Sequence, residues 1–130
     1  MRIAALALLV AAAVAAGCGS DESPAHNQLA QLIVRVDADG PRGPSPARVL
    51  RLTCHGPEQG PACGAAAGVS DADLAPTPPD RACTQIYGGP ETARISGTLR
   101  GERIDATYSR INGCEIARWD RVQDLLSAVR

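Results

Sequence analysis

Cysteine is the residue type in this sequence that offers the most chemistry. The 130 residues contain five, namely Cys18, Cys54, Cys63, Cys83 and Cys114. An odd number leaves one over when the others pair, and a separate role for Cys18 would account for it. Four cysteines in an oxidising compartment are typical of a disulfide framework. Spacing alone leaves all three possible pairings of these four open.

The residues around Cys18 have the features of an export signal. Arg2 is followed by an apolar stretch, residues 3–16, and by small residues just before the cysteine. As a helix this stretch spans about 21 Å, less than a hydrocarbon core of roughly 30 Å, so residues 1–17 are expected to be a cleavable signal. The cysteine that follows resembles a lipobox, which predicts a lipid on Cys18 and a polar tether over residues 18–27.

This lipid would be the protein's only tie to a membrane. The mature protein is then expected outside the cytosol, anchored to the outer face of the cell membrane. The alternative is an ordinary secretory signal in which Cys18 has no role, because Ala15 stands where lipoboxes usually carry leucine. In that case the protein is secreted.

The other reactive side chains do not form a recognisable catalytic group. Only two histidines occur: His26 lies in the tether and His55 follows Cys54. A metal or thiol site at Cys54 and His55 is a weak alternative, because exported thiols usually oxidise. The serines of the mature part have no histidine placed to activate them. We therefore expect no enzymatic activity, no metal and no cofactor.

Composition limits the size of the fold and its partners. Residues 28–130 have room for one domain with a modest core. The chain has no phenylalanine, so that core is expected to be aliphatic. The formal net charge is −1, with acidic residues and arginines interspersed, and nothing in this balance predicts a nucleic acid partner.

Alternation of apolar and polar residues predicts an antiparallel sheet. The β-branched run at residues 32–36 and the alternating run at residues 49–54 are expected to be two strands. Residues 92–99 and 103–109 alternate on either side of a turn that contains Gly101. This pattern is typical of a hairpin with one wet face.

Two segments are expected to be helical. Residues 61–68 are rich in alanine, and apolar residues recur at three- and four-residue steps over residues 116–129. Asp120 is the expected cap of the second helix, with Gln123 in the capping-box position, and Trp119 is expected in the core. The predicted fold class is α+β: a small antiparallel β-sheet with two short helices packed on one face, and two disulfides.

The four remaining cysteines lie in short motifs that follow one another in a fixed order. The motifs are Leu52-Thr53-Cys54, a Gly/Pro-rich loop to Cys63, Ala82-Cys83-Thr84-Gln85-Ile86-Tyr87, a hairpin from Gly97 to Gly101, and Asn112-Gly113-Cys114-Glu115. From about Leu29 to Glu115 this order resembles the Streptomyces subtilisin inhibitor family. The resemblance implies that Cys54 pairs with Cys63 and that Cys83 pairs with Cys114.

The resemblance also implies an activity for residues 28–130. Members of the family inhibit subtilisin-like serine endopeptidases with a rigid substrate-like loop, and a loop that is rigid beforehand avoids the ordering cost of binding. The implied reactive bond is Gln85-Ile86. The implied loop residues around it are Ala82, Cys83, Thr84 and Tyr87. Because Gln85 is neutral, an extracellular subtilisin-like protease is a better target than a trypsin-like one.

The chain departs from the family pattern after Tyr87, where Gly88-Gly89-Pro90 replaces the usual Asp-Pro. The loop from Cys54 to Cys63 is also shorter, and the carboxyl end has a helical pattern. The alternative function is therefore a lipid-anchored envelope protein with the same fold that binds another partner, or forms a homodimer. In that case residues 85–87 are only a surface loop.

Overall fold

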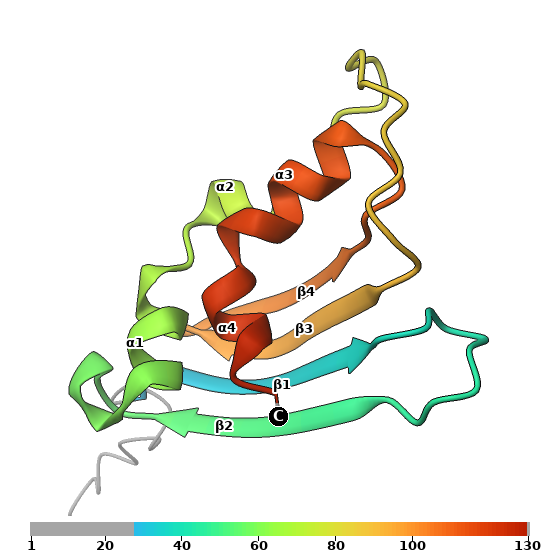
Figure 1. Cartoon of the computed structure of the whole chain (residues 1–130). Coiled ribbons are helices and arrows are strands. Elements are labelled where there is room, and N and C mark those ends of the chain that lie inside the picture. The colour runs from blue at the N-terminus through green and yellow to red at the C-terminus, as the bar shows by residue number, and fades with distance from the viewer. Residues whose placement is uncertain (1–27, 130) are drawn as a thin grey trace, which may run out of the picture.

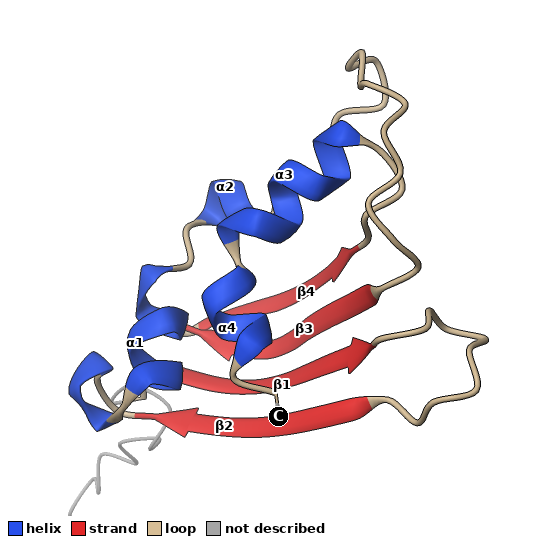
Figure 2. Cartoon of the chain, viewed as in Figure 1, coloured by secondary structure: helices blue, strands red, loops and turns tan. Residues whose placement is uncertain are grey.

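The computed structural model describes residues 28–129, which form one antiparallel sheet with helices packed on one of its faces (Figures 1 and 2). This arrangement confirms the predicted α+β class. The predicted signal at residues 1–17, the lipid site at Cys18 and the tether at residues 18–27 lie outside the described residues.

The sheet has four strands in the order β2-β1-β3-β4, and every neighbouring pair is antiparallel. The strands are β1 (Ala30–Asp37), β2 (Arg48–Cys54), β3 (Thr92–Leu99) and β4 (Glu102–Tyr108). All four were expected, β1 from its β-branched residues and the other three from the alternation. The hairpin between β3 and β4 turns at Arg100 and Gly101, whose φ angles of 49° and 83° match a type I′ turn.

The helices cover one face of the sheet (Figure 2). They are a short 3₁₀ helix η2 (Pro57–Gln59), α1 (Pro61–Gly68), α2 (Asp71–Leu74), α3 (Gly113–Arg121) and α4 (Gln123–Ser127). The first expected helix is α1. The second corresponds to α3 and α4 together, and α2 is an additional single turn.

The expected cap of the carboxyl-terminal helix is wrong. The helical segment begins at Gly113, where the Asn112 side chain accepts a hydrogen bond of 3.0 Å from the Glu115 N–H. Asp120 lies inside α3. The chain then leaves helical geometry at Val122, with φ −109° and ψ 8°, before α4 starts. Because the apolar spacing continues across the break at Val122, the sequence pattern predicts one helix instead of two.

The core lies between the sheet and the helices. Alternate residues of β1 are buried against the helices, while those between them face the opposite side. The largest fully buried side chains are Leu32, Ile95, Leu99, Leu125, Val34 and Val122. The core is therefore mainly aliphatic, as expected, with Tyr108 as its buried aromatic residue. Trp119 was expected in the core but is only partly buried, packed against its edge.

Candidate functional site

Both implied disulfides are present. Cys54 pairs with Cys63, with a Cα–Cα distance of 5.6 Å, and Cys83 pairs with Cys114 at 5.4 Å. The bonded Cys54 has no thiolate to share with His55, which removes the alternative metal or thiol site there. Two disulfides indicate an extracellular or otherwise oxidising environment.

The implied reactive residues lie in the segment between α2 and β3, which extends past the start of α3 (Figure 1). Residues 81–89 form no helix or strand. All of the implied loop residues are exposed except Cys83, which is half-buried. Ile86 is 61% exposed and Tyr87 is 65% exposed. Both large apolar side chains are therefore accessible to solvent at the surface of the loop.

Two main-chain hydrogen bonds flank the Gln85-Ile86 bond. Before it, the Thr84 carbonyl accepts from the Gly113 N–H at 2.9 Å. After it, the Gly88 N–H donates to the Arg110 carbonyl at 2.7 Å. The loop therefore runs antiparallel to the connection between β4 and α3, and the two segments lie side by side in Figure 1.

The two paired segments differ in length. Between the hydrogen bonds, the loop has three residues, 85–87, whereas the β4–α3 connection has two, Ile111 and Asn112. An extra residue on one of two paired segments makes that segment bulge outward. The Gln85-Ile86 bond lies within this longer segment, and both of its residues are exposed.

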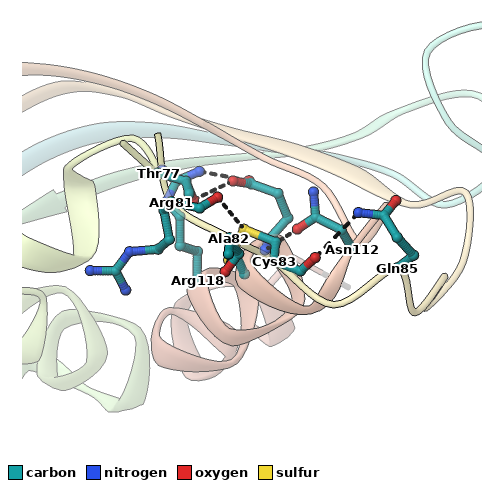
Figure 3. Close-up of a disulfide and its surroundings, with 9 residues drawn as sticks. Thr77, Arg81, Ala82, Cys83, Gln85, Asn112 and Arg118 are labelled. Carbon is teal, nitrogen blue, oxygen red and sulfur yellow. Dashed lines mark hydrogen bonds and ion pairs between the residues drawn. A yellow bond between two sulfur atoms is a disulfide. The ribbon is translucent and has the colours of Figure 1, made fainter. Parts of the chain in front are cut away.

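The Cys83–Cys114 disulfide anchors the amino-terminal side of the bulge. Cys114 belongs to the first turn of α3, whose start is fixed by the Asn112 cap, so the sulfur bridge attaches the loop to a helix end. The Gln85 side chain turns back along the loop, where its Nε2 donates to the Cys83 carbonyl at 3.2 Å (Figure 3).

The two glycines after Tyr87 are sites of close packing. A Cβ on Gly88 would lie 2.9 Å from the Ile116 Cδ1 and 3.2 Å from the Arg110 Cβ. Gly89 has a φ of +140°, and a Cβ there would collide with the Glu91 carboxylate. Glycine at position 88 lets the loop lie directly against α3 and the β4–α3 connection, and glycine at position 89 leaves room for the Glu91 carboxylate.

A buried arginine ties the start of the loop to the body of the domain. Arg118 is 6% exposed and donates to the carbonyls of Ala75, at 2.9 Å, and Thr107, at 3.1 Å. It also donates to the Glu115 carboxylate at 2.8 Å, and the other oxygen of that carboxylate accepts from the Thr77 hydroxyl at 2.6 Å (Figure 3). Sequence reasoning missed Arg118, for which the only local signal was its spacing of three residues from Glu115.

Tyr108 and Asp73 complete the polar contacts beneath this segment. The Tyr108 hydroxyl donates to the Asp73 carbonyl at 3.0 Å, and the Arg118 guanidinium lies 4.8 Å from the centre of the tyrosine ring. Burial raises the pKa of Tyr108 to about 12. A hydrogen bond from the Ser70 hydroxyl lowers the pKa of the Asp73 carboxyl, and the Arg121 guanidinium at 3.0 Å lowers it further.

In the described residues, the exposed Gln85-Ile86 bond is flanked by a disulfide and two main-chain hydrogen bonds. Within residues 28–129, no group of three or more His, Cys, Asp or Glu side chains is arranged to hold a metal ion. None of the helices in this range has both the length and the apolar character needed to cross a bilayer. Comparisons of the chain with protein-family models, with curated proteins and with solved structures give no match.

Proposed function

We propose that this chain is an inhibitor of subtilisin-like serine endopeptidases, and that the loop around Gln85-Ile86 enters the protease cleft in the manner of a substrate. One observation carries the proposal. The exposed bond lies between two anchors, the Cys83–Cys114 disulfide with its adjacent hydrogen bond on one side and the Gly88 hydrogen bond on the other. A loop held in this way loses little conformational entropy on binding.

The chemistry of the cleft explains why such a loop inhibits. The protease serine oxygen attacks the Gln85 carbonyl carbon, the bond to the Ile86 nitrogen breaks, and that nitrogen leaves as an amine with a proton from the protease histidine. If the amine stays in place, it attacks the new ester, restores the peptide bond and expels the serine. Inhibition then lasts because rejoining the bond is faster than hydrolysis of the ester by water.

The residues around the bond suggest the class of protease. Gln85 would occupy the primary specificity pocket, Thr84 and Ala82 would face neighbouring subsites, and Ile86 would lie just past the bond. A trypsin-like pocket has a buried carboxylate that requires a cation, which Gln85 does not supply. A broad, mainly apolar pocket accepts an uncharged glutamine, and this favours a subtilisin-like target.

The proposed site of action is outside the cytosol. The signal at residues 1–17 would export the chain, and a lipid on Cys18 would hold the domain at the outer face of the cell membrane. The disulfides fit such a compartment. The mass of the mature protein tests this part of the proposal, because a diacylglycerol on Cys18 adds directly to it.

Titration of subtilisin with the purified mature protein tests the inhibitory function. The residual activity of the protease is expected to fall to near zero at about one molar equivalent, as it does for a tight one-to-one complex. The Gln85→Gly variant, which has no side chain for the pocket, should inhibit more weakly. If the wild-type protein is degraded as an ordinary substrate, the alternative of a non-inhibitory envelope protein with this fold stands instead.

A further inference from the structure

We infer that Arg110 is a positioning residue that retains the Ile86 side of the reactive bond after the protease has cut it. This inference rests on the proposed inhibitory function. The ion pair with Glu91 and the contact with the Trp119 ring hold the Arg110 side chain in place.

The disulfide secures only one of the two new chain ends. When the bond is cut, the acyl group on Gln85 stays close to Cys83 and therefore to α3. The new amino group on Ile86 is on the other side of the cut, and its segment is next held by the sheet at β3, which starts at Thr92. Unless something holds residues 86–91, the amine drifts away and water hydrolyses the ester.

Arg110 contacts this segment at two points. Its main-chain carbonyl accepts the hydrogen bond of 2.7 Å from the Gly88 N–H, two residues past the cut. Its side chain donates from Nη1 to the Glu91 Oε1 at 3.0 Å, just before β3. Both ends of the short stretch from Gly88 to Glu91 are thus attached to the same residue. Two attachments three residues apart leave the stretch little freedom to swing outward.

The surroundings of Arg110 hold its side chain in one place. The guanidinium lies 6.0 Å from the centre of the Trp119 ring on α3, within reach of a cation–π interaction. The side chains of Arg110 and Glu91 are 30% and 31% exposed, so their ion pair is partly shielded from solvent. The absence of a side chain at Gly89 leaves room for the Glu91 carboxylate to approach.

The two attachments of residues 88–91 to Arg110, here called the clamp, have a direct consequence for the step that rejoins the peptide bond. The Ile86 amine must give up a proton to the protease histidine and attack the Gln85 ester carbon, which releases the serine with its proton. This step needs the amine within bonding reach of the ester while water competes. Loosening Arg110 therefore raises net hydrolysis, whereas the residues that fill the protease subsites are unchanged.

Arg110→Leu is the test, with Arg94→Leu as the matched control. Arg94 also pairs with a carboxylate, that of Asp105, but on the face of the sheet opposite the helices. Each mature protein is incubated with a catalytic amount of subtilisin, and cleavage at Gln85-Ile86 is followed by mass spectrometry after reduction. We expect cleavage of Arg110→Leu at this bond to be about tenfold faster or more, the effect of losing one charged hydrogen bond, with Arg94→Leu cut at the wild-type rate.

The outcomes separate the inference from the function on which it rests. If the wild-type protein inhibits and Arg110→Leu is cut no faster, the inference is overturned and the inhibitory function stands. If the wild type itself is degraded, both fall. Should Arg110→Leu unfold and be cut at many bonds, the isosteric Glu91→Gln variant decides. Faster cutting confined to Gln85-Ile86 in that variant supports the clamp, and a wild-type rate overturns it.

Discussion

The main-chain carbonyl of Thr84 accepts a hydrogen bond of 2.9 Å from Gly113, directly beside the Cys83–Cys114 disulfide. A covalent and a hydrogen-bonded tie in adjacent positions fix both the distance and the direction of the chain as it enters the bulge. The peptide bond that follows this carbonyl group's own is Gln85-Ile86. The exposed Gln85-Ile86 bond therefore follows a segment that is held both covalently and by a hydrogen bond.

If the proposed inhibitory function holds, removing the loop disulfide should convert the protein into a substrate of subtilisin. In the Cys83→Ser, Cys114→Ser double variant we expect the free energy of unfolding to fall by about 4 kcal/mol, because this bridge closes a long loop in the unfolded chain. Inhibition of subtilisin should be lost even where the protein remains folded, since the acyl end at Gln85 is no longer held. Urea unfolding and a protease titration measure the two effects.

The other disulfide supplies the control for this experiment. Cys54→Ser with Cys63→Ser removes the bridge between β2 and α1, and the expected loss of stability is about 3 kcal/mol. Below its melting temperature this variant should still inhibit. Equal inhibition by both double variants would contradict the role given to the Cys83 bridge.

Replacing Arg118 should lower the free energy of unfolding substantially. Arg118→Ala leaves the Ala75 and Thr107 carbonyls and the Glu115 carboxylate without their shared donor, and breaking a buried pair of this kind costs about 3 kcal/mol or more. Arg121→Ala on the same helix is the comparison: its side chain is 48% exposed, and such pairs contribute about 1 kcal/mol or less. Urea midpoints that shift equally in the two variants would show that Arg118 is not the main tie.

Stability at alkaline pH should depend on Tyr108. Burial raises its pKa from 10.0 to about 12, so the unfolded chain releases this proton at a lower pH than the folded protein does. The stabilisation from the neutral phenol is complete below pH 10 and is lost as the pH rises toward about 12. Urea unfolding across this range should show a smaller decline for Tyr108→Phe than for the wild type. Parallel declines would contradict the assignment.

The sequence predicted the strands closely because one-sided burial imposes a period of two. In β2, for example, the less exposed residues are the alternate ones, Leu50, Leu52 and Cys54, whereas β1 was expected from its β-branched residues. The helical break at Val122 was missed because apolar spacing continues through it. The cap at Asn112 was missed because the apolar pattern starts later, at Ile116. The disulfide pairing could not come from spacing, which left three choices, and was obtained from the resemblance.

The site was predictable only in part. The resemblance singled out Gln85 and Ile86, and the structure gives both an exposed position. The supporting residues were not foreseen, because they meet partners far away in the chain. Arg118 and Ala75, for example, are 43 residues apart. Polar contacts over such separations leave no periodic signal in a single sequence.

The inhibition constant of Gln85→Lys against trypsin tests the central claim most directly, because a lysine at the reactive position supplies the cation that the trypsin pocket requires. We expect this variant to inhibit trypsin at least about a hundredfold more tightly than the wild type, as a charge paired in a buried pocket would give, while its melting temperature is unchanged. Equal inhibition constants for the two proteins would contradict the placement of residue 85 in the protease pocket.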